Sequence, residues 1–167
     1  MKKNILITGK PRSGKSTLLR KLIVGVSNKV GFITNEIREE GERVGFEIET
    51  SGGSKALLAH VDFKTEHQVS KYFVDVKNLE VLISEASRFK GEDLLYLDEI
   101  GQMQLFSEEF KKLALSYLNS QNRCIATVSC IYEDDFIKRI KAREDVTLIE
   151  ITAENREEKE ILIAHYL

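Results

Sequence analysis

Residues 9–16 read Gly-Lys-Pro-Arg-Ser-Gly-Lys-Ser and match the phosphate-loop pattern G-x-x-x-x-G-K-[ST]. In this pattern the glycines let backbone N–H groups turn inward around phosphate oxygens, the ammonium of Lys15 lies near the β- and γ-phosphates, and the hydroxyl of Ser16 holds Mg²⁺. Residues 3–8 predict a buried strand before the loop, and residues 16–24 predict a helix after it. This order of strand, loop and helix forms an anion site, because the helix N-terminus adds a partial positive charge.

The composition narrows the class of protein. With 167 residues, 42% of them hydrophobic and 31% charged, the chain predicts one soluble globular domain spanning residues 1–167. The formal net charge of −2 gives no overall attraction to nucleic acid or to an anionic membrane, although a local basic patch stays compatible with it. The first strand starts almost at once and is too short for a signal-peptide core or a membrane span. We expect a cytoplasmic protein without a membrane partner, acting as a monomer.

Cysteine and histidine give no metal site. Cys124 and Cys130 are badly placed to pair with each other, and no nearby side chain completes a metal set. We expect free thiols in a reducing compartment. His60, His67 and His165 have no partners at ligand spacing, so we assign them no role.

The hydrophobic pattern of the rest of the chain predicts further strands and helices. Three strands joined by turns are predicted over residues 29–37, 43–50 and 55–61, and the middle one alternates apolar and polar residues as a half-exposed antiparallel strand does. Helices are then predicted over residues 78–89, 107–120 with Ser107 as N-cap, 134–143 and 154–167, and strands over residues 93–97, 123–129 and 146–151. The expected fold is α/β, with three layers α/β/α, a mostly parallel central sheet and an inserted antiparallel β-meander.

A second candidate motif follows the most apolar strand. Residues 94–97 end in Asp98 and Glu99, and an Asp at the carboxyl end of such a strand is the metal-positioning partner of a phosphate loop. We expect Asp98 to hold Mg²⁺ through a water, since Mg²⁺ gives up its hydration shell reluctantly, and Glu99 to activate or orient the attacking water. The expected catalytic residues are Glu99 and Lys15, the expected metal ligands are Ser16 and Asp98, and the expected nucleotide-binding residues are Gly9, Lys10, Pro11, Arg12, Ser13, Gly14, Lys15, Ser16, Thr17 and Asp98.

The adjacent Asp98 and Glu99 also predict a strand order. In phosphate-loop families with a catalytic Glu beside the metal Asp, another strand usually separates the two motif strands. Here that strand is residues 123–129. Thr127 or Ser129 at its end can then sense the γ-phosphate. The alternative is that each is an ordinary hydroxyl residue at the end of a strand, without contact to the nucleotide.

A set of short sequence blocks extends over nearly the whole chain. They are Gly31-Phe32-Ile33-Thr34-Asn35-Glu36-Ile37-Arg38-Glu39 with Gly41, Arg43, Gly45 and Phe46, then Lys71-Tyr72-Phe73-Val74, Leu79-Glu80, Asp98-Glu99-Ile100-Gly101-Gln102-Met103 and Asn155-Arg156. In order and content they resemble the small thermophile-type nucleoside-triphosphatases, the cancer-related NTPase family. The resemblance implies a RecA-like P-loop NTPase sheet with a catalytic Glu, Mg²⁺ dependence, and slow hydrolysis of ATP, GTP and other nucleoside triphosphates to diphosphate and phosphate.

The chain departs from the family pattern at three places. Arg12 stands where the loop usually has Gly, and Gln104 stands where Glu is common. Residues 129–132 lack the His-Arg pair of many members. A guanidinium would stabilise charge on phosphate oxygens in the transition state, and the sequence leaves its source open. The candidates are Arg12, Arg38, Arg43, Arg139 and Arg143.

Three functions are compatible with these motifs. The leading one is a Mg²⁺-dependent nucleoside-triphosphatase. The second is a nucleotide or small-molecule kinase, which usually closes an arginine-rich lid, whereas residues 132–135 are short and acidic. The third is a nucleotide-gated module that binds RNA or protein, against which the near-neutral charge argues weakly.

Overall fold

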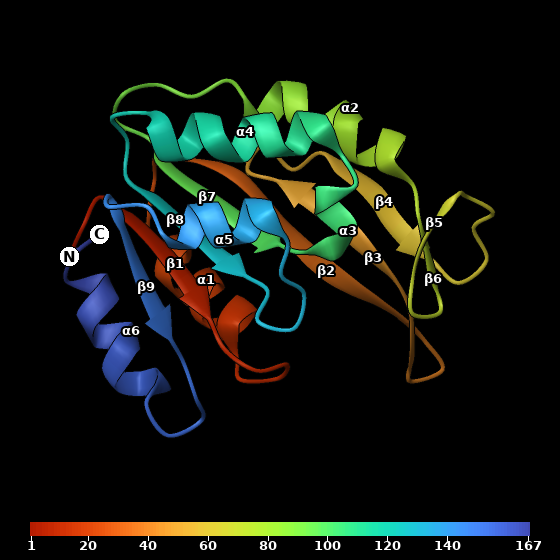
Figure 1. Cartoon of the computed structure of the whole chain (residues 1–167), viewed down its shortest axis with the longest axis horizontal. Coiled ribbons are helices and arrows are strands. Elements are labelled where there is room, and N and C mark those ends of the chain that lie inside the picture. The colour runs from red at the N-terminus through yellow and green to blue at the C-terminus, as the bar shows by residue number, and fades with distance from the viewer.

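A computed structural model describes all residues 1–167, which build a nine-stranded sheet flanked by helices (Figure 1). The strands are β1 (Asn4–Thr8), β2 (Lys29–Glu39), β3 (Glu42–Thr50), β4 (Lys55–His60), β5 (His67–Val69), β6 (Tyr72–Val74), β7 (Leu94–Ile100), β8 (Cys124–Val128) and β9 (Val146–Glu150). The helices are α1 (Lys15–Val24), α2 (Val76–Ala86), α3 (Gln102–Leu105), α4 (Glu108–Asn119), α5 (Asp135–Lys141) and α6 (Arg156–Ala164). None of these helices is both long and apolar enough to span a lipid bilayer.

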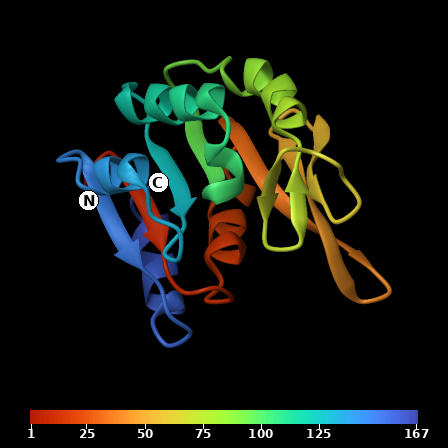
Figure 2. The ribbon, with the colours of Figure 1, turned by 45° about the vertical axis from the view of Figure 1, so that its right-hand side comes forward.

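The sheet has a parallel part and an antiparallel part. Its strand order is β5-β6-β4-β3-β2-β7-β8-β1-β9. Strands β2, β7, β8, β1 and β9 are parallel to one another, whereas β3, β4, β6 and β5 continue the sheet from β2 in antiparallel pairs. The β2–β3 hairpin extends beyond the parallel part (Figure 2). Because β8 pairs with both β1 and β7, the predicted intervening strand between the two motif strands is confirmed.

Successive side chains of β1 point to opposite faces of the sheet, and helices cover both of these faces. Leu6 belongs to an apolar cluster with side chains of α2, α4 and α5, and Ile5 and Ile7 belong to a second cluster with α1 and α6. All three β1 side chains are at most 1% exposed. A strand covered on both faces needs apolar residues at every position, which explains its continuous hydrophobic run. The predicted three layers are therefore confirmed.

Most predicted elements agree with the structure to within a few residues at their ends. The meander is β2, β3 and β4, and Ser107 is the N-cap of α4, where its hydroxyl accepts a 3.1 Å hydrogen bond from the Phe110 N–H. The sequence reading missed β5, β6 and α3, which have three, three and four residues. Segments this short do not establish a hydrophobic period.

Candidate functional site

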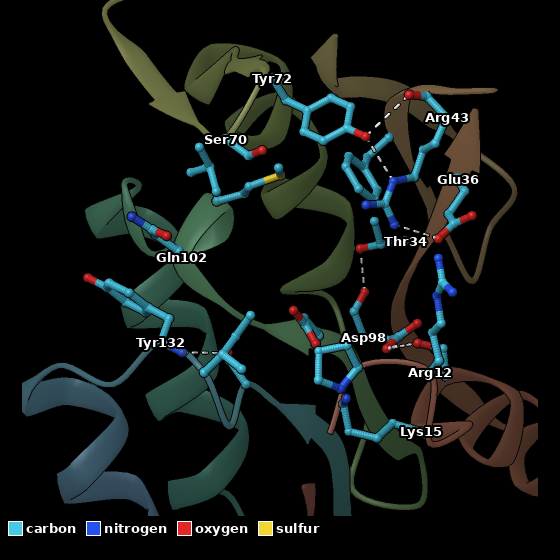
Figure 3. A pocket seen from close by; sticks show the side chains of 18 of the residues that line it. Arg12, Lys15, Thr34, Glu36, Arg43, Ser70, Tyr72, Asp98, Gln102 and Tyr132 are labelled. Atoms are coloured by element: carbon cyan, nitrogen blue, oxygen red, sulfur yellow. Dashed lines mark hydrogen bonds and ion pairs between the residues drawn. The ribbon is translucent and has the colours of Figure 1, made fainter. Parts of the chain in front are cut away.

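A cleft of about 1050 Å³ lies at the carboxyl ends of the parallel strands. It is lined by the loop after β1, the β2–β3 hairpin, the β5–β6 connection, and the residues that follow β7 and β8. In Figure 3, Lys15 and Asp98 lie at one end of the cleft, and Arg43 and Tyr72 lie at the other. The carboxyl edge of a parallel sheet is where α/β folds bind ligands, and a volume of this size suits a small organic molecule.

The loop after β1 leaves backbone donors available at the start of α1. Gly14 is the N-cap of α1 in a left-handed conformation with φ 93°, and no side chain caps the helix. The first N–H groups of the helix are therefore without intrahelical or side-chain partners, as in anion-binding loops. The Lys15 Nζ donates to the carbonyls of Gly9 at 2.9 Å and Lys10 at 3.3 Å, which holds the ammonium across the loop.

Asp98 joins the end of β7 to this loop. Its Oδ1 accepts hydrogen bonds from the Ser16 hydroxyl at 2.8 Å and from the Thr127 hydroxyl at 2.5 Å. The residue is 1% exposed, and its Oδ2 is buried without a hydrogen-bond partner. Burial raises the pKa of the Asp98 carboxyl, while the hydroxyls of Thr127 and Ser16 act in the opposite direction. A buried carboxylate oxygen without a donor, beside a hydroxyl, is an oxygen-donor set that suits a hard cation.

Glu99 lines the same cleft, one residue after Asp98. Burial raises the pKa of Glu99, the charge of Asp98 raises it further, and Lys15 opposes both. Gly101 leaves room for the Glu99 side chain, because a Cβ at Gly101 would lie 2.7 Å from Glu99 Oε1. The site therefore holds two neighbouring carboxyl groups, of which one is tied to the phosphate loop and one is free of side-chain hydrogen bonds.

Thr34 adds a contact that the sequence reading did not find. Its hydroxyl donates to the Asp98 backbone carbonyl at 2.5 Å, and its own carbonyl accepts from Arg20 at 2.8 Å. Arg20 also donates to Asn35 Oδ1 at 2.9 Å, so a side chain of α1 connects the loop helix to β2. Thr34 and Asn35 belong to a sequence block quoted for the family resemblance, but nothing in the local pattern assigns them a contact with β7.

The structure separates the five candidate arginines into two groups. Arg12, Arg38 and Arg43 line the cleft, whereas Arg139 and Arg143 do not. Arg43 is held in place: it donates to the Tyr72 hydroxyl and to Glu36, each at 2.9 Å. The Tyr72 hydroxyl is the first cause of the raised pKa of Arg43, with the Glu36 carboxylate adding to it.

The remaining predicted residues are placed as follows. Pro11, Thr17 and Ser129 line the cleft, and Thr127 is buried behind it with its hydroxyl on Asp98 rather than exposed to a ligand. The loop residues that do not line the cleft are Gly9, Lys10 and Ser13. Both cysteines are unpaired, as expected, with Cys124 buried and Cys130 exposed at the cleft. None of the three histidines lines the cleft.

Comparisons with known proteins agree with this arrangement. A family model described as NTPase matches residues 4–163. The chain is 40% identical to the nucleoside-triphosphatase THEP1 of Thermotoga maritima over 91% of this chain and 88% of the relative, and 31% identical to the human cancer-related nucleoside-triphosphatase over 93% and 92%. The crystal structure of THEP1 from Aquifex aeolicus superposes with a TM-score of 0.87 at 31% identity, covering 98% of both chains. The solution structure of the human protein gives a TM-score of 0.80 at 29% identity, covering 98% of this chain and 96% of that one. The fold is therefore that of a P-loop NTPase, and the chain belongs to the NTPase family.

Proposed function

We propose that the protein is a Mg²⁺-dependent nucleoside-triphosphatase that releases diphosphate and phosphate. The observation that carries the proposal is the hydrogen bond between Ser16 and Asp98, which brings the phosphate loop and the acidic motif into one site. Membership of a family whose relatives are named nucleoside-triphosphatases supports it. ATP, GTP and other triphosphates as substrates, a cytoplasmic location and a monomeric state remain predictions.

Binding of the triphosphate tail is assigned to the loop after β1. The N–H groups at the start of α1 bind phosphate oxygens, and Lys15 exchanges its two backbone carbonyls for the β- and γ-phosphates. Thr17, the next residue of α1, lines the cleft beside the loop. Phosphoryl transfer depends chiefly on such positioning and on neutralising charge.

The oxygen donors around Asp98 fit Mg²⁺. The unpartnered Asp98 Oδ2 and the Ser16 hydroxyl are hard ligands, and Mg²⁺ takes few protein ligands because it keeps several waters and binds phosphates. When bound, the ion neutralises charge on the β- and γ-phosphate oxygens. Thr127 and the Thr34 hydroxyl hold Asp98 in the orientation needed.

Glu99 is assigned the proton transfer. Its carboxylate accepts a proton from the attacking water as the water oxygen bonds to the γ-phosphorus, and the bond from that phosphorus to the bridging oxygen of the diphosphate breaks. The raised pKa of Glu99 makes it a stronger base than an ordinary carboxylate while it is ionised.

Two variants test the proposal. Lys15→Ala and Glu99→Gln are each expected to slow phosphate release by about 100-fold or more, measured with ATP, GTP, CTP and UTP, with and without Mg²⁺. Lys112→Ala and Glu92→Gln, which change exposed charges away from the cleft, are the matched controls. Glu99→Gln should still bind nucleotide in calorimetry, and undiminished turnover of this variant would refute the role of Glu99.

The size of the cleft favours one second candidate. The cleft reaches from the phosphate loop to Tyr72 and Tyr132, which is more space than a triphosphate tail and a water need. If a second substrate placed its hydroxyl beside Glu99, that hydroxyl would accept the phosphoryl group and the protein would be a kinase. Diphosphate production without any added acceptor separates the two reactions.

A further inference from the structure

The order of the strands defines two ends of the bound nucleotide. The phosphate loop follows β1, whose neighbours are β8 on one side and β9 on the other. Asp98 and Glu99 lie near the carboxyl end of β7, beyond β8, so the terminal phosphate points toward β7 if the proposed function holds. The nucleoside then leaves the loop on the opposite side, toward the connection between β9 and α6.

Arg156 lies at that connection and packs on the phosphate loop. It is the first residue of α6, and its guanidinium fills the space beside Gly14. A Cβ placed on Gly14 would lie 2.6 Å from Arg156 Nη1 and 3.1 Å from its Cδ. The arginine therefore lies against Gly14, the N-cap of α1.

The guanidinium is positioned but has no polar partner. Arg156 is half-buried, and its side chain takes part in none of the hydrogen bonds or ion pairs of the structure. Two nearby acidic residues are occupied elsewhere, since Glu158 pairs with Lys159 at 3.0 Å and Glu160 pairs with Lys21 at 3.2 Å.

Side-chain hydrogen bonds of Asn155 stabilise the connection between β9 and α6 that precedes Arg156. The Asn155 Oδ1 accepts from the Thr152 N–H at 2.8 Å, and its Nδ2 donates to the Glu150 carbonyl at 3.2 Å. These bonds fix the backbone immediately before Arg156. A planar cation whose side chain has no hydrogen-bond or ion-pair partner is thus held beside the loop, at the end where we infer that the nucleoside emerges.

We propose that Arg156 is a nucleobase-binding residue, whose guanidinium stacks on the base of the nucleoside triphosphate. Guanidinium groups stack on aromatic faces, and every base presents such a face, so this contact binds purines and pyrimidines alike. A stacked arginine therefore gives affinity for nucleosides without selecting one base, and the larger purine rings gain more from it. This inference rests on the proposed function.

The test compares ligands with and without a base. Arg156→Ala and Arg156→Lys are titrated by calorimetry, in Mg²⁺, with ATP, GTP, CTP, UTP and inorganic tripolyphosphate. Both variants are expected to bind the nucleotides about tenfold more weakly, with the larger loss for ATP and GTP, and to bind tripolyphosphate as the unmodified protein does. Arg88→Ala, at an exposed arginine remote from the loop, is the matched control and is expected to bind all five ligands unchanged.

Each other outcome has a definite meaning. An equal loss of affinity for tripolyphosphate places Arg156 on the phosphates or makes it a support of the loop, and overturns base stacking. Unchanged nucleotide binding by Arg156→Ala overturns it as well, as does full retention by Arg156→Lys, which keeps the charge but not the plane. If the unmodified protein binds tripolyphosphate and no nucleotide, or neither, the proposed function itself fails.

Discussion

The Ser16 hydroxyl donates a 2.8 Å hydrogen bond to Asp98 Oδ1, although the two residues are 82 positions apart in the chain. Ser16 lies in the first turn of α1, directly after the phosphate loop, and Asp98 lies near the carboxyl end of β7, which is separated from β1 by β8. The bond shows that the loop and the acidic motif form one site.

Thr127→Val should weaken the proposed metal site without disturbing the core. The substitution keeps the shape of the buried side chain and removes the hydroxyl that donates to Asp98 Oδ1 at 2.5 Å. We expect the Mg²⁺ concentration needed for half-maximal phosphate release to rise by about 10-fold or more, as for other residues that orient a metal ligand. Thr127→Ser, which keeps the hydroxyl, is the control. Equal Mg²⁺ dependence of all three proteins would contradict this role.

Gly101→Ala should displace Glu99. The new Cβ would lie 2.7 Å from Glu99 Oε1, and the backbone at Gly101, with φ −138°, accepts alanine without strain. We expect kcat to fall by about 10-fold or more while nucleotide affinity changes little, because a general base must lie within hydrogen-bond reach of its proton. Gly91→Ala, where nothing lies within 4 Å of the added atom, is the matched control. A wild-type kcat for Gly101→Ala would show that the position of Glu99 is not critical.

Arg43→Ala should slow turnover, whereas Arg139→Ala should not. Arg43 is held in the cleft by Tyr72 and Glu36, whereas Arg139 makes its hydrogen bond to the carbonyl of Asp135 within its own helix. Arg43 lies at the other end of the cleft from Asp98, so it stabilises charge at the γ-phosphate only if the β2–β3 hairpin closes on the nucleotide; its removal then lowers kcat by about 100-fold, the scale for losing one charge-stabilising group. Steady-state phosphate release measures both variants. Equal rates for the two would remove Arg43 from the candidates.

Asp145→Asn should lower stability at neutral pH more than it does in acid. Asp145 accepts two 2.8 Å hydrogen bonds from Arg143, and this pairing lowers the pKa of Asp145 below its ordinary value of 3.8. A carboxyl with a lowered folded-state pKa stabilises the protein above its unfolded pKa, and the contribution is lost as pH falls through the folded pKa. Because the pair is partly exposed, we expect a loss of about 0.5–1 kcal/mol at pH 7 that high salt reduces.

Urea unfolding at pH 7 and at pH 3 measures that difference. Glu92→Gln, at an exposed carboxylate that takes part in no side-chain hydrogen bond or ion pair, is the control. A destabilisation of Asp145→Asn that is as large at pH 3 as at pH 7 would show that the effect is not electrostatic.

The sequence alone determined the elements whose cause is local. The phosphate loop can be recognised from residues 9–16 alone, because its glycines set the conformation of their own backbone and its lysine contacts the ligand directly. The apolar run of β7 and the alternation in β3 likewise report the burial of each strand, since side-chain period reflects which faces are covered. The strand order was predicted from the adjacent Asp98 and Glu99 by analogy, and the pairing of β8 with β1 and β7 confirms it.

Only the tertiary structure decided which groups meet. The sequence leaves open whether Thr127 or Ser129 senses the γ-phosphate or is an ordinary strand-end hydroxyl. In the structure the Thr127 hydroxyl is bound to Asp98, and Thr34 reaches the same residue from β2. Arg43 and Arg143 look alike in the sequence, and one lines the cleft while the other pairs with Asp145 outside it. The contacts that Thr127 and Thr34 make with Asp98 join residues far apart in the chain, and their distances depend on how the helices and strands pack. No local pattern of residue types contains that information, because propensity and periodicity act only between near neighbours.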